Sequence, residues 1–468
     1  MTPAQINTII TQMYNCFLWL VVFLVLFNFV HFLVSTFAFY FRFRALHSEN
    51  IDRFTSSPSF PGVTFLMPCK NEEEHIITHI EALLNLQYRN KQIIVINDGS
   101  TDNSLLKLIE HFKMVKLPAG LPQRFPTSKI NGYYRSSGHP NLMVIDKVNG
   151  GKADALNAAI NLCNTPYFVS ADADTFIESE GFHRAMFSFL TVKDAVALGS
   201  PLSVLNECSV VNGKIEKVVF PRNLLAGIQT LEYMRGFFNF RAGASLFGGN
   251  MVVPGAFGIF DRKSVQSVGG YPTDTVTEDL GLTMRLYRKL KGEGRPFTID
   301  FVPASVAWTI VPDKIKPLWQ QRERWQRGTL KVLGQYWFFF LNPYYGLLGL
   351  VGFPLILLET LFPLIEIACY FLAFTAFFAG VLNWDFLVQG LIAGIALSML
   401  MSAIALFVEE LTFRRYPLIR NLPQILLYAL IECVGLRHWL LLARIQAFWK
   451  VLRRDNQWRS GKITIVKQ

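Results

Sequence analysis

Long apolar runs at both ends of the chain constrain its fold more than any other feature of the sequence. The first run, from Tyr14 to Tyr40, contains no Asp, Glu, Lys or Arg. It exceeds the roughly 20 residues that a helix needs to cross a bilayer. Further apolar runs occupy most of 347–451. The sequence therefore predicts a membrane protein whose water-soluble part lies between these runs.

The N-terminal run is expected to be an uncleaved transmembrane anchor, residues 1–45. No basic segment precedes it and no small-residue cleavage site follows, so a signal peptide is the weaker interpretation. Arg42 and Arg44 follow the run directly. Positive charge flanks membrane spans on the cytoplasmic side, which predicts that 54–334 lie in the cytoplasm.

The C-terminal part, 343–451, is expected to contain interfacial and transmembrane helices. Two prolines and two glutamates interrupt its first apolar run. We interpret that run as an interfacial or broken helix to about Glu359, followed by a span to about Leu382. A second span returns over 386–408.

The apolar stretch 422–451 is ambiguous because Glu432 and Arg437 interrupt it. A full crossing would place the basic tail, 452–468, outside the cell, against the positive-inside rule. A re-entrant or interfacial helix avoids this conflict and is the preferred interpretation.

Composition narrows the class of protein. The chain has 51% hydrophobic residues, a net charge of +11 and a pI near 9.3. The basic residues gather beside the apolar runs, which is typical of a membrane face and not of a nucleic-acid-binding stripe. No nucleic-acid partner is predicted. The six cysteines form no CxxC pair, so no zinc site or disulfide framework is indicated.

The central segment alternates short β-rich runs with helical stretches, which indicates βαβ units and a mostly parallel, Rossmann-like sheet. The expected strands are 63–67, 92–97, 142–145 and 167–170, and the clearest helices are 72–86, 102–112 and 152–163. Residues 117–140, rich in Pro, Gly, Ser and basic residues, are interpreted as a surface loop.

Asp172 and Asp174 follow an apolar strand and are separated by one residue. Side chains at alternate positions of an extended segment share a face. Two buried carboxylates there repel each other. Mg²⁺ and Mn²⁺ prefer oxygen ligands and commonly bridge carboxylates to substrate phosphates. A solvated acidic turn is the alternative, but the preceding βαβ pattern favours a divalent metal site.

Further polar residues stand just beyond the expected strands. Glu72 and Asp98 each follow one, at the sheet edge where open parallel sheets bind ligands. Gly150, Gly151 and Lys152 open a helix, so the backbone can approach a phosphate and the lysine supplies a cation. Each pattern alone also occurs in an ordinary turn followed by a helix cap.

Two motifs follow nearer the C-terminal runs. Glu278 and Asp279 form an acidic pair that can supply a general base, although acids also favour a helix N-terminus. Gln321, Arg324 and Trp325 stand on an expected helix. Arginine binds phosphate bidentately and tryptophan offers a flat face to a sugar ring. An amphipathic interfacial helix has a similar composition.

In this order, the motifs resemble the signature set of processive family 2 glycosyltransferases, which includes cellulose, chitin, hyaluronan and poly-N-acetylglucosamine synthases. They are PCKNE (68–72), NDGS (97–100), GKA (151–153), DAD (172–174), TED (277–279) and QRERW (321–325). The resemblance covers about 62–330, with membrane segments on both sides. It implies a GT-A fold, inverting transfer from a UDP-sugar, and Mg²⁺ or Mn²⁺ as cofactor.

The resemblance also implies a role for each position. Glu72 and Asp98 would contact the uridine, Asp172 would assist nucleotide binding, and Asp174 would bind the metal. Asp279, beside Glu278, would be the catalytic base. Lys152, Gln321 and Arg324 would hold the diphosphate, and Trp325 would hold the acceptor sugar. The stretches 308–312 and 249–255 look most like the poly-N-acetylglucosamine and chitin-oligosaccharide branch, which favours UDP-N-acetylglucosamine as donor.

The expected partners are therefore the UDP-sugar, a growing polysaccharide and membrane lipid. Export or accessory subunits are possible further partners. The expected location is a bacterial inner or plasma membrane. Two alternatives stay open. One is synthesis of a different polymer, glucan or hyaluronan-like, and the other is non-processive transfer of one sugar to a lipid-linked acceptor.

Overall fold

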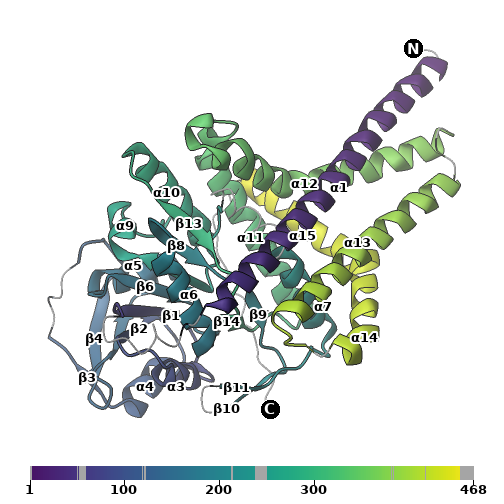
Figure 1. Ribbon diagram of the computed structural model, residues 1–468. Coiled ribbons are helices and arrows are strands. Elements are labelled where there is room, and N and C mark those ends of the chain that lie inside the picture. The colour runs from purple at the N-terminus through teal and green to yellow at the C-terminus, as the bar shows by residue number, and fades with distance from the viewer. Residues whose placement is uncertain are drawn as a thin grey trace.

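The computed structural model describes residues 3–453 except 50, 52–59, 119, 121–122, 212–213, 238–249, 381, 383 and 417. A nine-stranded sheet in the order β13-β8-β12-β6-β1-β2-β5-β4-β3 forms the centre of the α/β domain (Figure 1). Its strands are β1 Val63–Cys69, β2 Lys91–Asp98, β3 Met114–Lys116, β4 Ile130–Ser136, β5 Leu142–Lys147, β6 Tyr167–Ala171, β8 Ala195–Gly199, β12 Phe257–Asp261 and β13 Thr298–Phe301. Two small sheets join β7 Phe176–Ile177 to β14 Ala307–Thr309 and β9 Leu202–Val204, and β10 Ser209–Val211 to β11 Lys214–Lys217.

The centre of the sheet is parallel, as the alternating pattern predicts. β1 pairs in parallel with both β2 and β6, and β2 pairs in parallel with β5. Towards the edges, β12 and β4 run antiparallel to their neighbours, so the sheet is mixed. The carboxyl ends of the four parallel strands meet at one edge, and the acidic motifs follow these ends.

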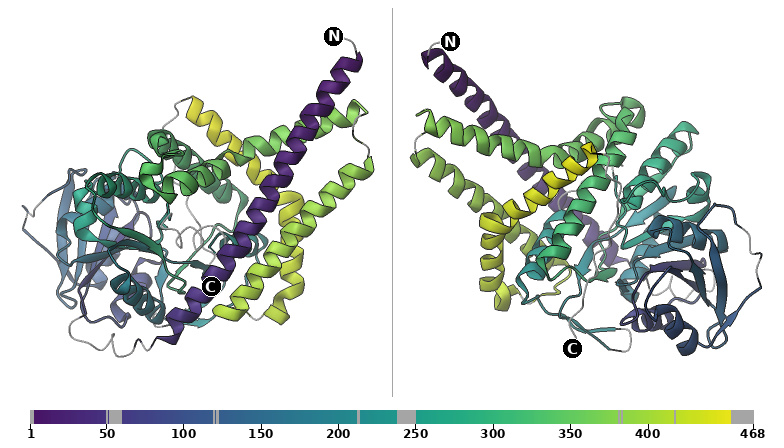
Figure 2. Two further views of the ribbon diagram at one scale, coloured as in Figure 1. Left: turned by 45° about the horizontal axis from the view of Figure 1, so that its top comes forward. Right: turned by 180° about the vertical axis from the view of Figure 1, so that it is seen from behind.

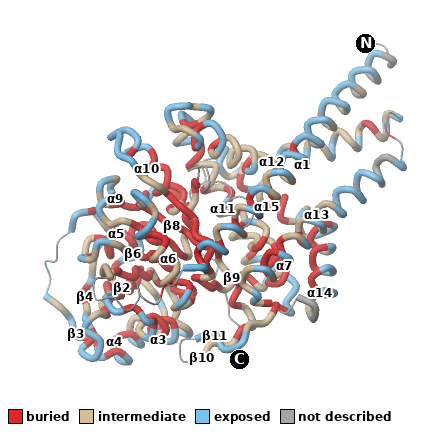
Figure 3. The backbone as a smooth tube through the Cα atoms, in the orientation of Figure 1, coloured by how far each residue is buried: buried red, intermediate tan, exposed pale blue. Residues whose placement is uncertain are grey.

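Helices cover both faces of the sheet. Neighbouring residues of one strand enter different cores: Leu66 packs with Leu156 on α5 (Lys152–Leu162), whereas Phe65 packs with Ile80 on α3 (Ile76–Asn85). This alternation is the period of two that a strand imposes. The remaining helices of the domain are α4 Ser104–His111, α6 Ser179–Thr191, α7 Leu224–Gly236, α9 Arg262–Ser267, α10 Glu278–Gly292 and α11 Ile315–Gln335. Figure 3 shows the strands as the most continuously buried part of the chain.

One expected loop contains a strand. The interpretation of 117–140 as irregular is wrong for 130–136, which form β4 and pair with β5. Pairing satisfies backbone groups of β5 that would otherwise be an open edge, and it buries Tyr133. The Asn, Gly and Ser residues of this strand weaken its sequence signal. The strand is stabilised instead by its pairing with β5.

Three long helices project together from the α/β domain (Figures 1 and 2): α1 Pro3–Ser48, α12 Phe353–Phe378 and α13 Trp384–Thr412. Large apolar side chains such as Phe371, Phe374 and Phe378 are exposed on them. The described residues contain four segments long and apolar enough to cross a membrane: Thr11–Ser48, Leu348–Phe378, Val388–Thr412 and Asn421–Leu452. Exposed apolar surface of this length is stable in lipid, so the chain is a membrane protein.

The first C-terminal helix differs from expectation. No break occurs at Glu359: α12 is continuous from Phe353 to Phe378 and contains Pro363. The irregular turn precedes it, in the π-helical segment η4 Leu348–Gly352. A proline is tolerated within a membrane helix because neighbouring helices or local adjustments of the backbone satisfy the carbonyl group that loses its hydrogen bond.

The ambiguous segment folds as α14 Leu418–Ile431, the π-helical turn η5 Glu432–Leu436 and α15 Arg437–Leu452. α15 lies along α11. The rings of Trp319 and Trp439 stand 4.5 Å apart, and Trp319 Nε1 donates to Gln446 Oε1 at 2.6 Å. These polar contacts with a water-soluble helix favour the interfacial interpretation, and the number of crossings stays a prediction.

The domain boundaries 1–45, 54–334 and 343–451 stay predictions as well. The basic tail at 452–468 lies outside the described residues from 454 onward. One of the two arginines after the anchor has a definite partner: Arg42 Nη2 is 2.7 Å from Oδ2 of the buried Asp300 on β13. This ion pair joins the C-terminal part of α1 to the edge strand β13 of the sheet.

Candidate active site

One continuous cavity of about 2540 Å³ runs from the edge of the sheet to the membrane helices. Eight of the ten predicted site residues line it: Lys152, Asp172, Asp174, Glu278, Asp279, Gln321, Arg324 and Trp325. They come from segments up to 173 positions apart in sequence. The fold thus brings together most of the motifs that the sequence suggests.

The acidic pair after β6 lies at the sheet end of this cavity. Lys152 Nζ is 2.5 Å from Asp172 Oδ1 and 3.1 Å from Glu278 Oε1. Burial alone would lower the pKa of Lys152, but Asp172 and Glu278 raise it above its usual value, so the lysine is charged. Lys152 therefore connects Asp172, in the candidate metal site, to Glu278, in the acidic pair that could supply the general base.

Asp174 stands in a different electrostatic environment from Asp172. Its buried Oδ1 has no hydrogen-bond partner among the described residues. Burial, together with the charges of Asp172 and Glu72, raises the pKa of Asp174 to about 7. A buried carboxylate oxygen without a donor, facing other carboxylates, fits a cation ligand.

The acidic residues that open α10 are held from the opposite side by Gly255. The Gly255 amide donates to Asp279 Oδ2 at 3.1 Å, and Lys152 Nζ donates to the Gly255 carbonyl at 3.0 Å. A Cβ at Gly255 would stand 3.0 Å from Lys152 Nζ and 3.4 Å from Asp279 Oδ2. A side chain at this position would therefore crowd Lys152, and glycine lets the backbone approach both groups closely.

The Q-x-x-R-W motif lies on α11. Trp325 is 36% exposed, and the Arg322 guanidinium stands 4.7 Å from its ring centroid. Arg322 also pairs with Glu232 of α7. Arg324 forms neither a hydrogen bond nor an ion pair with any residue that the structure describes. A tryptophan face and an uncommitted guanidinium thus line the same cavity.

Two predicted contacts of the uridine do not line the cavity. Asp98 is buried, and its oxygens accept from Lys147 Nζ at 2.7 Å and from the amides of Gly150 and Gly151 at 2.9 and 2.8 Å. Glu72 lies near the acidic pair, and burial followed by the charges of Asp102 and Asp172 raises its pKa to about 7. The implied base-binding role of these residues stays a prediction.

Sequence reasoning missed three residues that support this site. Lys147 is fully buried beside Asp98. His79 on α3 is buried and its Nδ1 contacts the carbonyl oxygen of Ala173, the residue between the two aspartates. Glu232 pairs with Arg322. None belongs to a motif; only Lys147, a charged residue at the end of an apolar strand, carried a local signal.

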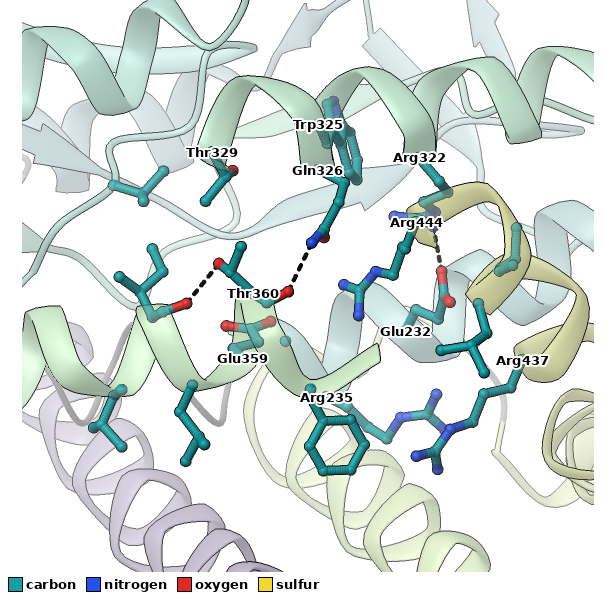
Figure 4. Close-up of a pocket in the computed structure, with 18 of the residues that line it drawn as sticks. Glu232, Arg235, Arg322, Trp325, Gln326, Thr329, Glu359, Thr360, Arg437 and Arg444 are labelled. Atoms are coloured by element: carbon teal, nitrogen blue, oxygen red, sulfur yellow. Dashed lines mark hydrogen bonds and ion pairs between the residues drawn. The ribbon is translucent and has the colours of Figure 1, made fainter. Parts of the chain in front are cut away.

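Figure 4 shows the membrane-side part of the cavity, between α11, α12, α7 and α15. Four arginine side chains lie around it, and three of them pair with glutamates: Arg322 with Glu232, Arg235 with Glu432, and Arg437 with Glu366 at 3.6 Å. Arg444 points into the cavity, and among the described residues it has neither a hydrogen-bond nor an ion-pair partner. Glu359 and Thr360 of α12 face it from the other side.

The sequence is similar to two described protein families and to several characterised proteins. The chain matches the family described as "Glycosyl transferase family group 2" over residues 167–409, more than half of its length, and "Glycosyl transferase family 2" over 64–269. The poly-beta-1,6-N-acetyl-D-glucosamine synthase of Staphylococcus aureus (strain COL) is 28% identical over 331 residues, which are 70% of this chain and 68% of that protein. The synthase of the same description from Staphylococcus epidermidis is 30% identical over 273 residues, 58% of this chain and 55% of that protein.

One solved structure is similar to the chain at a low level. It is a mannosyltransferase from Pyrobaculum calidifontis in complex with GDP-Man and Mn²⁺, with a TM-score of 0.48, 15% identity, and coverage of 88% of this chain and 98% of that one. The family assignment depends on the sequence match and on the mixed sheet with its motifs at one edge. The protein belongs to glycosyl transferase family group 2, and its α/β domain has the GT-A fold.

Proposed function

We propose that this protein is a membrane-embedded, inverting glycosyltransferase that polymerises a UDP-sugar into a β-linked polysaccharide and conducts the product into the membrane. The observation that carries the proposal is the single cavity that joins the acidic pair and Lys152 to Trp325 and then to the membrane helices. The descriptions of the staphylococcal relatives support UDP-N-acetylglucosamine as the donor.

The donor diphosphate is assigned to the sheet end of the cavity. Lys152 stands at the start of α5, where unpaired backbone amides and the helix dipole favour a phosphate. Asp174, with Asp172, would hold Mg²⁺ or Mn²⁺, ions that prefer oxygen ligands and commonly bind carboxylates together with substrate phosphates. A bound divalent cation neutralises charge on the departing UDP.

Asp279 is the proposed general base, and Glu278 is not. Glu278 is 9% exposed and forms an ion pair with Lys152 at 3.1 Å. Asp279 instead accepts backbone hydrogen bonds from Gly255 and Leu280, which orient its carboxylate at the cavity wall. A carboxylate within hydrogen-bond reach of the attacking hydroxyl can take its proton as the bond to the anomeric carbon forms.

The acceptor is assigned to the segment of the cavity beyond the donor. Trp325 offers a partly exposed ring, and Gln321 and Arg324 of the same helix line the same cavity. Farther along, the arginine and glutamate pairs of Figure 4 provide donors and acceptors for sugar hydroxyl and acetamido groups. This length of polar lining favours a growing chain over a lipid-linked acceptor that receives one sugar.

The proposed location is the plasma membrane of a bacterium, with the α/β domain in the cytoplasm where UDP-sugars are made. Arg42 and Arg44 lie at the domain end of α1, in agreement with the positive-inside rule. Membrane lipid covers the exposed apolar faces of α1, α12 and α13, and export or accessory subunits can bind there as well.

The proposal is tested by incubating the detergent-solubilised protein with a panel of UDP-sugars and Mn²⁺ or Mg²⁺. We expect UDP release with UDP-N-acetylglucosamine, and its loss on adding a chelator. The product is then sized on a gel and digested with linkage-specific hydrolases. Turnover with another sugar alone would overturn the donor assignment, and a product of one added sugar would favour the lipid-linked alternative.

Replacing Arg444 by Met should shorten the product about tenfold, because each charged hydrogen bond to the bound chain slows its dissociation by roughly that factor. The donor KM should not change, since Arg444 lies on the membrane side of Trp325. Product length on a sizing gel and UDP release measure the two effects. Arg453→Met, an exposed arginine at the end of the same helix, is the matched control; equal shortening there would contradict the assignment.

A further inference from the structure

Lys147, the last residue of β5, is the most completely buried charged residue beside the active site. Its exposed fraction is 0%, and its Nζ lies 2.7 Å from Asp98 Oδ1, 2.5 Å from Asp154 Oδ2 and 2.8 Å from the carbonyl oxygen of Val148. Fully buried lysines are rare unless paired. The two carboxylates therefore supply the ion pairs that a fully buried lysine needs.

The two carboxylates fasten different pieces of backbone. Asp98 accepts from the amides of Gly150 and Gly151, and Asp154 accepts from the amide of Ser128 at 3.0 Å. Together they join the end of β2, the end of β5, the segment before β4 and the first turn of α5. A Cβ at Gly150 would stand 2.2 Å from Asp154 Oδ2, so this packing leaves no space for a side chain.

The loop held in this way leads directly to the cavity. Gly151 has a φ of +87°, in the region that favours glycine. The next residue is Lys152, whose Nζ reaches Asp172, Glu278 and the Gly255 carbonyl. Residues 149–153 line the cavity, whereas Asp98 and Lys147 do not. A shift of the loop would therefore move Lys152 and the start of α5 relative to the donor.

We propose that Lys147 is a positioning residue for the donor diphosphate. With Asp98 and Asp154 it forms a buried triad that holds the Gly150–Gly151 loop and the first turn of α5 in the conformation that binds phosphate. Within the triad, Asp98 pairs with Lys147 and accepts from the amides of Gly150 and Gly151, so it holds this loop directly. This inference depends on the proposed use of a nucleotide-diphosphate donor.

Lys147→Met tests the proposal, because it removes the ammonium and keeps the length and apolar stem of the side chain. Two buried carboxylates then lack their counter-charge, and the loop that they hold should shift. We expect the donor KM and the dissociation constant of UDP to rise about tenfold or more, with kcat changed by less than about threefold. The affinity for uridine, which has no phosphate, should not change.

Lys91→Met is the matched control. Lys91 begins β2, at the end of the strand opposite Asp98, and its Nζ bonds only backbone carbonyls of Leu84 and Leu86. The affinity of Lys91→Met for UDP should equal that of the wild type. Equal losses of UDP and uridine affinity in Lys147→Met would show that the triad shapes the nucleoside part of the site and not the diphosphate position. A fall in kcat with an unchanged UDP affinity would show that the loop does not serve the diphosphate. Either result overturns the proposal.

Asp154→Asn keeps the proposal testable if Lys147→Met fails to fold. It preserves side-chain shape and leaves one carboxylate opposite Lys147, so the protein should remain folded. UDP affinity should fall, by less than in Lys147→Met, with uridine affinity unchanged; UDP affinity equal to that of the wild type would overturn the triad. Binding of UDP is measured without turnover, so its outcome is separate from the donor-panel experiment that tests the proposed function.

Discussion

Asp279→Asn is expected to lower sugar transfer about 100- to 10,000-fold, the range that a general base contributes. The amide of asparagine cannot accept the proton of the attacking hydroxyl. Because Asp279 does not contact the proposed phosphate position, the affinity for UDP should stay within about twofold of the wild type. Incorporation of labelled sugar and equilibrium binding of UDP measure the two quantities.

Glu293→Gln is the control for this substitution, since Glu293 caps the other end of α10 and is exposed. It should leave transfer unchanged, because exposed ion pairs contribute little. Glu278→Gln separates the two acidic neighbours: we expect weakened donor binding, because Lys152 loses a partner. If Glu278→Gln abolished transfer while Asp279→Asn retained it, the roles of the two residues would have to be exchanged.

Asp174→Asn is expected to reduce transfer about 100-fold or more, because the electrostatic stabilisation of the departing UDP depends on a correctly held cation. The same substitution should not destabilise the metal-free protein. Folding raises the pKa of Asp174 to about 7. A carboxyl whose pKa is raised by folding destabilises the fold progressively as the pH rises above its unfolded-state pKa, and fully above about pH 7. At pH 8 with a chelator, the melting temperature of the variant should equal or exceed that of the wild type.

Adding Mn²⁺ together with UDP should raise the melting temperature of the wild type, since a ligand of the native state stabilises it. It should raise that of Asp174→Asn much less. Asp194→Asn, an exposed aspartate in the turn before β8, is the control and should behave as the wild type. A full metal-dependent shift in Asp174→Asn would remove this residue from the proposed ligands.

The predicted helices and strands around the motifs are confirmed closely, because their signals are local. The apolar run before Asp172 is β6, the Gly-Gly-Lys turn opens α5 at Lys152, and α10 begins at Glu278. Each depends on a short apolar run or on a helix start. β4 was missed because Asn131, Gly132 and Ser136 have weak strand preference and the strand is held by pairing with β5.

The sequence alone determined the membrane character, the family and eight of the ten candidate site residues that line the cavity, because runs of apolar residues and short motifs are read along the chain. Tertiary structure decided how those residues act. Only the fold shows that Lys152 joins Asp172 to Glu278, that Gly255 orients Asp279 and that Asp98 belongs to a buried triad with Lys147. These contacts join residues from 20 to 126 positions apart, and burial and charge pairing at such separations arise only when the sheet and its loops assemble.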